Sequence, residues 1–240
     1  NNNGVIAIDM DENKEYVILG KGVGFGKKVS QRFDKPEGCT TYRLEQETER
    51  GSAKELVKEI EPEYLEIADA ILTESQKVFG DSIDRGILFP LADHISFAVA
   101  RIRRNEQISN PLTEDIKVLF YSEFKVAETL KTILRERLQI EIDDHEVGYV
   151  ALHIHSAIGD EKVSVAMQTA RAVRECIDML EKATGKPIDV LSLSYNRLMN
   201  HMKYMVARAS TGEKLNLDMN EYMLDQYPQA YKVATDICKN

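Results

Sequence analysis

The sequence predicts a multidomain fold, in which a small antiparallel β domain precedes two all-α helical-bundle modules, the second of them incomplete. Short runs of β-branched residues, separated by turn-forming residues, occupy most of the first 44 positions. From Ser52 onward, apolar residues recur every three or four positions, which is typical of amphipathic helices. A segment around His94 recurs around His201, which indicates a duplicated module. We expect the domains to comprise residues 1–50, 51–160 and 161–240.

The N-terminal β domain, which we call the head (residues 1–50), contains several short predicted strands. Residues 5–8 and 16–19 are β-rich runs that flank a turn-like segment, and a further short strand is expected near residues 41–44. A sheet of this size buries little apolar surface on its own. We therefore predict that the head is stabilised by a second copy, as a homodimer.

Glycine occupies every second position of residues 20–26, and this pattern has two interpretations. A dinucleotide fingerprint is excluded, because the sixth position counted from Gly20 is Phe25 rather than glycine. The first interpretation, which composition alone favours, is a glycine-rich hairpin with a bulge. The second is a backbone that nucleic acid can approach closely, with Phe25 stacking on a base. In that case phosphates would be held by Lys21, Lys27 and Lys28.

The rest of the chain is expected to be helical. Ser52 and Glu55 have the spacing of a helix capping box, and apolar residues from Ile60 onward follow at helical spacing. Pro62 is expected to separate a linking helix from the first helix of the body. Further helices are expected at roughly residues 85–104, 112–138, 144–158, 162–183, 188–209 and 216–239.

The internal repeat extends over two separate segments with one offset. Residues 93–102 and 200–209 share a histidine and a Val-Ala-Arg string, and His201 follows His94 by 107 residues. The same offset aligns residues 124–127 with 231–234. The first copy ends near Ala157, so a complete second copy would extend to about residue 264. The second module is therefore expected to be incomplete within this chain.

Composition is that of a soluble globular protein. The 240 residues are 43% hydrophobic and 30% charged, and no apolar run approaches the ~20 residues of a membrane-spanning helix. Three cysteines, far apart in sequence, form neither a disulfide framework nor a zinc cluster, and we expect a reducing, cytoplasmic location. The net charge of −9 argues against general coating of nucleic acid. It leaves room for a local site, because residues 20–33 contain four basic residues and no acid.

The sequence contains no recognisable catalytic constellation. A zinc-protease motif is excluded, because Tyr149 stands where the second histidine after His145 and Glu146 would have to be. His153 and His155 diverge on a helix and do not share a metal there. No serine or cysteine is spaced with a base in the manner of a nucleophile. The sequence therefore predicts neither an enzyme nor a cofactor or metal site.

Two histidines recur with the repeat, each with an arginine two helical turns later. His94 is followed by Arg101, and His201 is followed by Arg208, with each imidazole expected at the edge of an apolar stripe. A buried, hydrogen-bonded histidine that simply recurs with the module is one interpretation. The repetition beside an arginine favours a second one, in which these imidazoles are modified or change charge.

The chain resembles a known family, the bacterial transcriptional antiterminators of the β-glucoside and sucrose operon type. In the head, the resemblance is carried by Asn1-Asn2-Asn3 and by the run Gly20-Lys21-Gly22-Val23-Gly24-Phe25-Gly26-Lys27-Lys28. In the body, it is carried by Asp93-His94-Ile95, by residues 146–154 (EVGYVALHI) and by Asn200-His201-Met202-Lys203-Tyr204. Members of this family join a small RNA-binding domain to two phosphotransferase-system regulation domains, and the resemblance covers nearly the whole chain.

The resemblance implies a function, partners and site residues. It implies that the protein binds an RNA hairpin that overlaps a terminator, through Asn1, Asn3, Gly20, Lys21 and Phe25. It also implies regulation by phosphorylation of three histidines, which are His94, His153 and His201. HPr and a sugar-permease component would be the phosphate donors, and Arg101 and Arg208 would support the modified groups.

A competing hypothesis assigns no nucleic acid to the protein. In that case the chain is a dimeric helical regulator that senses phosphorylation, and the head only holds two copies together. Phe25→Ala distinguishes the two hypotheses, because it should abolish RNA binding without affecting the dimer only if the head reads RNA.

Overall fold

The structure is a computed structural model, and it divides the chain into two compact units. The first unit comprises residues 1–110 and 122–163, and the second comprises residues 111–121 and 164–240. The structure describes residues 3–10, 12, 14–44, 47–48, 51–52, 57, 59–106, 108–159, 162–189, 192–213 and 219–239.

The head contains a three-stranded antiparallel sheet with the order β1-β2-β3, as the sequence predicts. Gly4 pairs with Leu19 and Asp9 with Lys14, while Leu19 also pairs with Thr40 of the third strand. The second half of the central strand, residues 17–19, is buried, whereas Ile6 and Ile8 of the edge strand are 59% and 55% exposed. A two-stranded ladder, β4 with β5, follows the sheet. The strands are β1 (Gly4–Asp9), β2 (Lys14–Leu19), β3 (Thr40–Arg43), β4 (Glu47–Thr48) and β5 (Gly51–Ser52).

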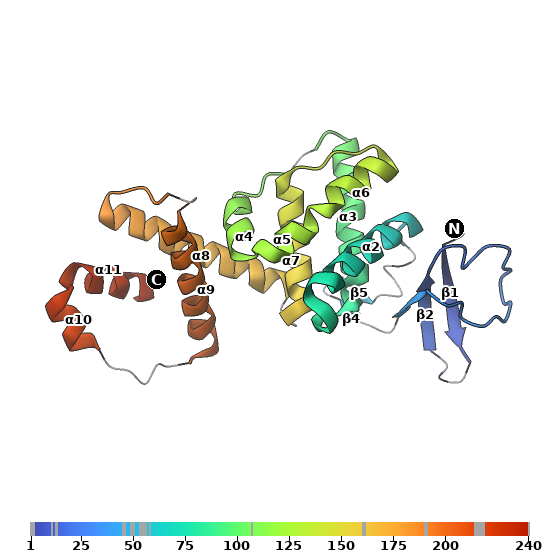
Figure 1. Cartoon of the computed structure of the whole chain (residues 1–240), viewed down its shortest axis with the longest axis horizontal. Coiled ribbons are helices and arrows are strands. Elements are labelled where there is room, and N and C mark those ends of the chain that lie inside the picture. Colours follow the sequence, from blue (N-terminus) through green and yellow to red (C-terminus); the bar gives the residue numbers. More distant parts are fainter. Residues whose placement is uncertain are drawn as a thin grey trace. The chain divides into compact units, whose positions relative to one another are not determined.

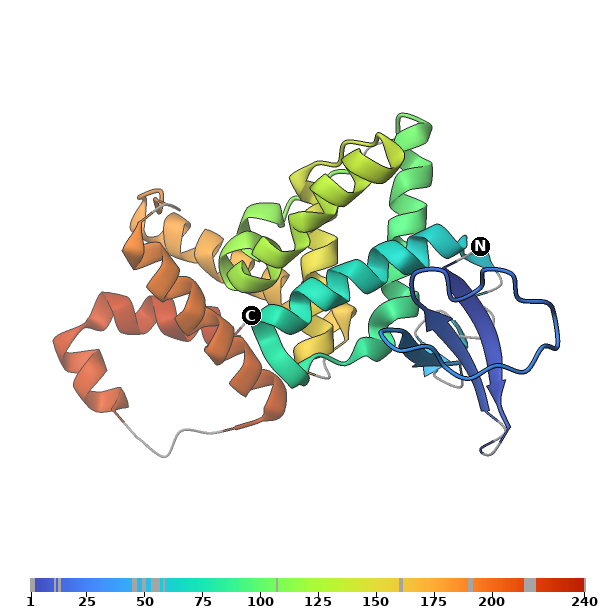
Figure 2. The same cartoon turned by 45° about the vertical axis from the view of Figure 1, so that its right-hand side comes forward.

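The glycine-rich run forms consecutive tight turns, so the hairpin interpretation is wrong. The amide of Phe25 donates to the carbonyl of Gly22 at 2.9 Å, and the amide of Lys27 donates to that of Gly24 at 3.3 Å. Gly22 and Gly26 have φ values of 72° and 69°, which side-chain-bearing residues rarely adopt. Bonds between residues three apart close turns and leave no register for a strand ladder. The chain between β2 and β3 is irregular throughout (Figure 2).

Helices of the first unit pack around a core formed by α2, α3 and α7 (Figure 1). Pro62 is the first residue of α2, where its missing N–H costs nothing, and the predicted start of a helix of the body at this residue is confirmed. Most of the linking helix expected before it lies outside the described residues. The predicted capping box at Ser52 and Glu55 lies outside the described residues. The helical elements of this unit are α2 (Pro62–Phe79), η1 (Gly80–Ser82), η2 (Arg85–Ile87), α3 (Leu88–Arg103), α5 (Tyr121–Ala127), α6 (Thr129–Leu138) and α7 (Asp144–Gly159).

The single helix expected at 112–138 is wrong, because the segment forms three helices. The first, α4 (Thr113–Leu119), ends at Phe120, whose backbone is not helical, with φ −124° and ψ 48°. Phe120 and Phe124 are both fully buried. No glycine or proline marks the break, so burial of these two aromatic side chains explains the bend better than local propensity does.

In the part of the second unit that the structure describes, α4 is joined by four further helices. The single helix expected at 216–239 is also wrong, since Tyr227 interrupts it and Pro228 starts a new helix. The duplication is visible in the structure, because α10 begins and ends 107 residues after α4. The other helices are α8 (Val163–Thr184), α9 (Leu193–Thr211), α10 (Asn220–Gln226) and α11 (Pro228–Lys239). Within the described ranges, no helix combines the length and apolar character needed to cross a bilayer.

Candidate functional site

Asn3 holds the start of the glycine-rich loop, so two groups of predicted site residues lie together. Its backbone carbonyl accepts a hydrogen bond from Gly20 N–H at 2.9 Å, and its Oδ1 accepts one from Gly22 N–H at 2.9 Å. A side chain at Gly20 would force Cys39 to move, because a Cβ there would lie 2.4 Å from the sulfur of Cys39 and 3.3 Å from its Cα. The loop is therefore attached firmly at its base. Asn1 lies outside the described residues.

Phe25 is displayed on the outside of this loop. Its side chain is 74% exposed, whereas Val23, two residues earlier, is 2% exposed and anchors the loop to the head. An exposed aromatic ring held by an anchored backbone is a platform on which an unpaired base can stack.

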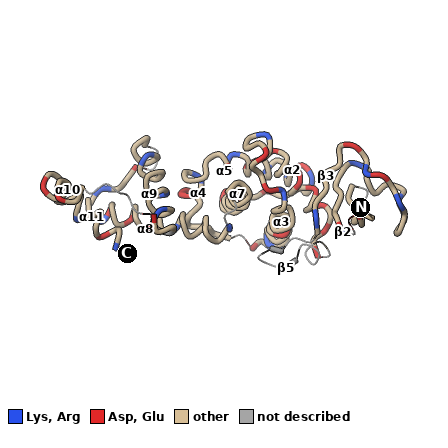
Figure 3. Tube along the Cα trace, turned by 90° about the horizontal axis from the view of Figure 1, so that it is seen from below, with Lys and Arg blue, Asp and Glu red and all other residues tan. Residues whose placement is uncertain are grey.

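Basic side chains belong to the same loop as the displayed ring. Lys21 and Lys28 are exposed, and the Lys27 ammonium lies 4.2 Å from the ring centroid of Phe33. In the sequence, Lys and Arg outnumber Asp and Glu between β2 and β3, in residues 20–39; Figure 3 marks the charged positions along the whole trace. This arrangement suits a polyanion that also offers flat apolar faces, which describes single-stranded or looped RNA.

A cluster of aromatic and imidazole rings occupies the contact between α3 and α7. The ring centroids of His94 and His153 are 5.3 Å apart, and those of His94 and Tyr149 are 5.7 Å apart. The His94 side chain is 18% exposed. The structure thus brings together the two histidines that the sequence singles out in the first module.

A buried carboxylate, Glu146, joins this cluster and was not among the predicted site residues. Arg101 Nη2 donates to both Glu146 oxygens, at 2.8 and 3.1 Å, and His94 Nε2 lies 3.5 Å from Glu146 Oε2. Burial raises the pKa of the Glu146 carboxyl, but its interactions with His94 and Arg101 lower it by more, so the pKa lies below its ordinary value. Glu146 is therefore a buried anion at neutral pH.

The signal that could have identified Glu146 is its spacing. Arg101 follows His94 by seven residues on α3, and His153 follows Glu146 by seven residues on α7. Seven residues are two helical turns, so each pair shares one face of its helix. Where the two helices pack, the four side chains come together.

His155 makes a separate contact on another side of α7. Its Nδ1 lies 2.8 Å from Glu123 Oε1 of α5, and both side chains are largely buried. His153 and His155 therefore diverge on the helix, as predicted. Within the described residues, only His153 of this pair has a ring contact with His94.

His201 of the second unit is exposed, so its predicted position at the edge of an apolar stripe is wrong. The buried face of α9 consists of Tyr195, Met199 and Met202, and His201 points away from it. Arg208 is half-buried. These three buried positions correspond to Leu88, Ala92 and Ile95 of α3 at the 107-residue offset, so α9 keeps the apolar register of α3. His94 is shielded because Tyr149 and His153 of α7 pack against its side of α3.

Comparisons with known proteins agree along the whole chain. The model of the CAT RNA-binding domain matches residues 1–51, and that of the PRD domain matches residues 69–157 and 172–240. The "GlcA/glcB genes antiterminator" of Staphylococcus carnosus is 30% identical, covering 100% of this chain and 84% of that protein. "Transcription antiterminator LicT" of Bacillus subtilis is 24% identical, covering 99% of this chain and 86% of that protein. The crystal structure of GlcT CAT-PRDI, which is 28% identical, matches with a TM-score of 0.56 over 66% of this chain and 94% of that one.

Proposed function

Because the chain belongs to the transcription antiterminators that join a CAT RNA-binding domain to PRD domains, we propose that it binds an RNA hairpin overlapping a terminator and that histidine phosphorylation controls this binding. Its relatives are named as antiterminators, so the chain is a regulatory RNA-binding protein rather than an enzyme. This confirms the function class predicted from the sequence.

The observation that supports RNA binding most directly is the display of Phe25. A ring that is 74% exposed gains nothing for the fold, yet the loop that carries it is anchored by Asn3 and Val23. Stacking of a base on such a ring contributes about 1–3 kcal/mol, and the lysines add a salt-dependent attraction for phosphate. Because unpaired bases are needed for stacking, the proposed target is a hairpin with internal loops.

We infer a head dimer from the edge strand. Ile6 and Ile8 project from the same side of β1 and are both more than half exposed, which places an apolar face on a small domain. A two-fold head dimer would present two Phe25 rings to an RNA with two similar internal loops.

The histidine cluster supports control by phosphorylation. A phosphoryl group on His94 or His153 adds a charge near −2 beside the buried anion Glu146. Arg101 is placed to bind that group, because guanidinium pairs well with phosphate, and it would then leave Glu146. The contact between α3 and α7 would have to repack, and this is how the state of a histidine would reach the rest of the dimer. We assign HPr and a sugar-permease component as phosphate donors, and we include His201, which is accessible, with Arg208 as its supporting group.

The test is a titration of the chain against a short RNA hairpin with two internal loops, at two salt concentrations. We expect Phe25→Ala to weaken binding by about tenfold or more, the equivalent of one lost stacking contact. Val29→Ala is the matched control, because Val29 lies in the same loop and is 98% exposed. If the chain is dimeric but does not bind the hairpin, or if neither substitution changes its affinity, the result would favour a phosphorylation sensor that does not bind RNA.

A further inference from the structure

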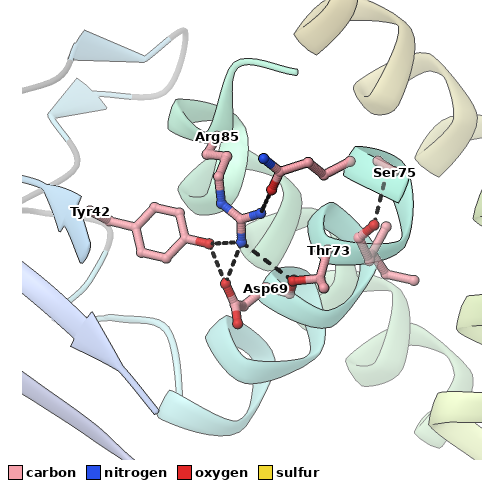
Figure 4. A network of polar contacts seen from close by, with 7 residues as sticks. Tyr42, Asp69, Thr73, Ser75 and Arg85 are labelled. Carbon is pink, nitrogen blue, oxygen red and sulfur yellow. Dashed lines mark hydrogen bonds and ion pairs between the residues drawn. The ribbon is translucent and has the colours of Figure 1, made fainter. Parts of the chain in front are cut away.

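A polar network fastens the head to the first helical module within the first unit. Arg85 of η2 donates from Nη2 to the Tyr42 hydroxyl and to Asp69 Oδ1, both at 2.7 Å, and Tyr42 in turn donates to Asp69 (Figure 4). Tyr42 belongs to β3 of the head, whereas Asp69 belongs to α2. The Tyr42 ring also packs edge-on against Phe89, with 6.4 Å between the ring centroids.

This network is well suited to fix an orientation. Tyr42 is 4% exposed, and the Arg85 and Asp69 side chains are each 23% exposed, so the three groups are largely removed from water. Arg85 Nη1 additionally donates to Gln76 Oε1 at 2.9 Å, which ties the guanidinium to a second position on α2. A guanidinium with several fixed acceptors permits one geometry, so α2 is held at a defined place beside the sheet.

In that orientation, α2 engages a residue of the proposed RNA site. Asn3 Nδ2 donates to Glu66 Oε2 at 3.2 Å, while Asn3 Oδ1 is already occupied by the Gly22 amide. Both ends of the Asn3 side-chain amide are therefore bonded within the protein. Glu66 is itself positioned by Arg137, whose Nη1 lies 3.7 Å from the same carboxylate oxygen.

The surroundings of this contact are acidic. An open cleft beside Asn3 is lined by Glu61, Pro62, Glu63 and Glu66 at the beginning of α2. RNA offers phosphate and base oxygens as acceptors for an asparagine amide, and a carboxylate is an acceptor of the same kind. Glu66 thus occupies the place of an RNA acceptor, and the neighbouring carboxylates oppose the approach of phosphate.

We propose that Glu66 is an autoinhibitory competitor of RNA: it binds the Asn3 amide when the Tyr42–Asp69–Arg85 network holds the head against α2. This proposal rests on the proposed function, because it requires Asn3 to contact RNA. It adds a specific route for regulation. A change in the helical module that opens the network withdraws Glu66, releases the Asn3 amide and removes the acidic cleft from the RNA path.

The test measures hairpin affinity for Glu66→Ala beside the unsubstituted chain. Removing the competitor should raise the affinity by roughly two- to tenfold, the equivalent of one solvent-compensated hydrogen bond. Tyr42→Phe should raise it as well, because this change keeps the ring against Phe89 and removes only the hydroxyl from the network. Circular dichroism checks that both variants retain the helical content of the unsubstituted chain.

Glu63→Ala is the matched control, because it removes the same charge from the same cleft, one turn before Glu66. Equal gains from Glu63→Ala and Glu66→Ala would overturn the proposal in favour of a general electrostatic effect. Unchanged affinity in Glu66→Ala, with binding still weakened in Phe25→Ala, would also overturn it and leave the proposed function intact. If none of the chains bound the hairpin, the proposed function itself would fail.

Discussion

Removing Arg101 is expected to destabilise the contact between α3 and α7 substantially. Arg101→Ala deletes two charge-assisted hydrogen bonds to Glu146 and leaves that carboxylate, in a residue that is 3% exposed, without the guanidinium that pairs with it. Losing one partner of a buried ion pair costs about 3–5 kcal/mol. The Arg101 side chain is 24% exposed, so water can partly replace it, and we expect a loss of about 2–4 kcal/mol.

Hydrogen exchange followed by mass spectrometry is the suitable assay, because a chain with two compact units need not unfold in one step. Protected amides of α3 and α7 should exchange roughly thirty- to several-hundredfold faster in Arg101→Ala. The control is Arg104→Ala, which breaks an exposed pair with Glu106 and should change little. Adding Glu146→Gln to Arg101→Ala should restore most of the protection, since the buried charge is gone. If exchange were unchanged in Arg101→Ala, or no slower in the double variant, the assignment of Glu146 as a buried anion would be refuted.

Three further outcomes are expected. The pKa of Glu146 lies below its ordinary 4.5, so the free energy of unfolding should fall as pH drops through that lowered pKa. Urea titrations at several pH values should show a shallower fall in Glu146→Gln. An unchanged slope would contradict this expectation. Burial raises the pKa of Asp115 above 3.8 despite Arg174, so the contribution of Asp115 to stability declines as pH rises through the raised pKa. Asp115→Asn should lessen this decline, because the asparagine oxygen can still accept the hydrogen bond from Tyr195. Urea titrations at several pH values measure the decline, and an unchanged decline in Asp115→Asn would contradict the expectation. Gly20→Ala should destabilise the head by about 1–3 kcal/mol through contact with the Cys39 sulfur. Adding Cys39→Ala should restore most of this stability in thermal melts. If the double variant were no more stable than Gly20→Ala, contact with the sulfur would not be the cause.

Much of the architecture could be predicted because it rests on local patterns. The three strands of the head follow from short β-branched runs, and the duplication follows from one offset shared by two segments. The start of α2 follows from Pro62, whose backbone suits the first turn of a helix. These features depend on a few neighbouring residues and therefore leave a trace in the sequence.

Other features depend on distant contacts, and the sequence patterns missed them. The break at Phe120 carries no glycine or proline and results from burial of an aromatic side chain. Glu146 looks like any charged residue at the start of a helix until α3 supplies Arg101. Tyr42 and Arg85 lie 43 residues apart, so their hydrogen bond becomes apparent only in the folded chain.

We propose above that this chain allows transcription to continue by binding RNA through the displayed ring of Phe25. The most direct measurement is transcription in vitro from a template with the hairpin and terminator, comparing the unsubstituted chain with Phe25→Ala and Val29→Ala. We expect the unsubstituted chain and Val29→Ala to increase read-through to the same extent, whereas Phe25→Ala should need at least about tenfold more protein for the same read-through. Equal read-through with all three chains, or none with a chain that binds the hairpin, would contradict it.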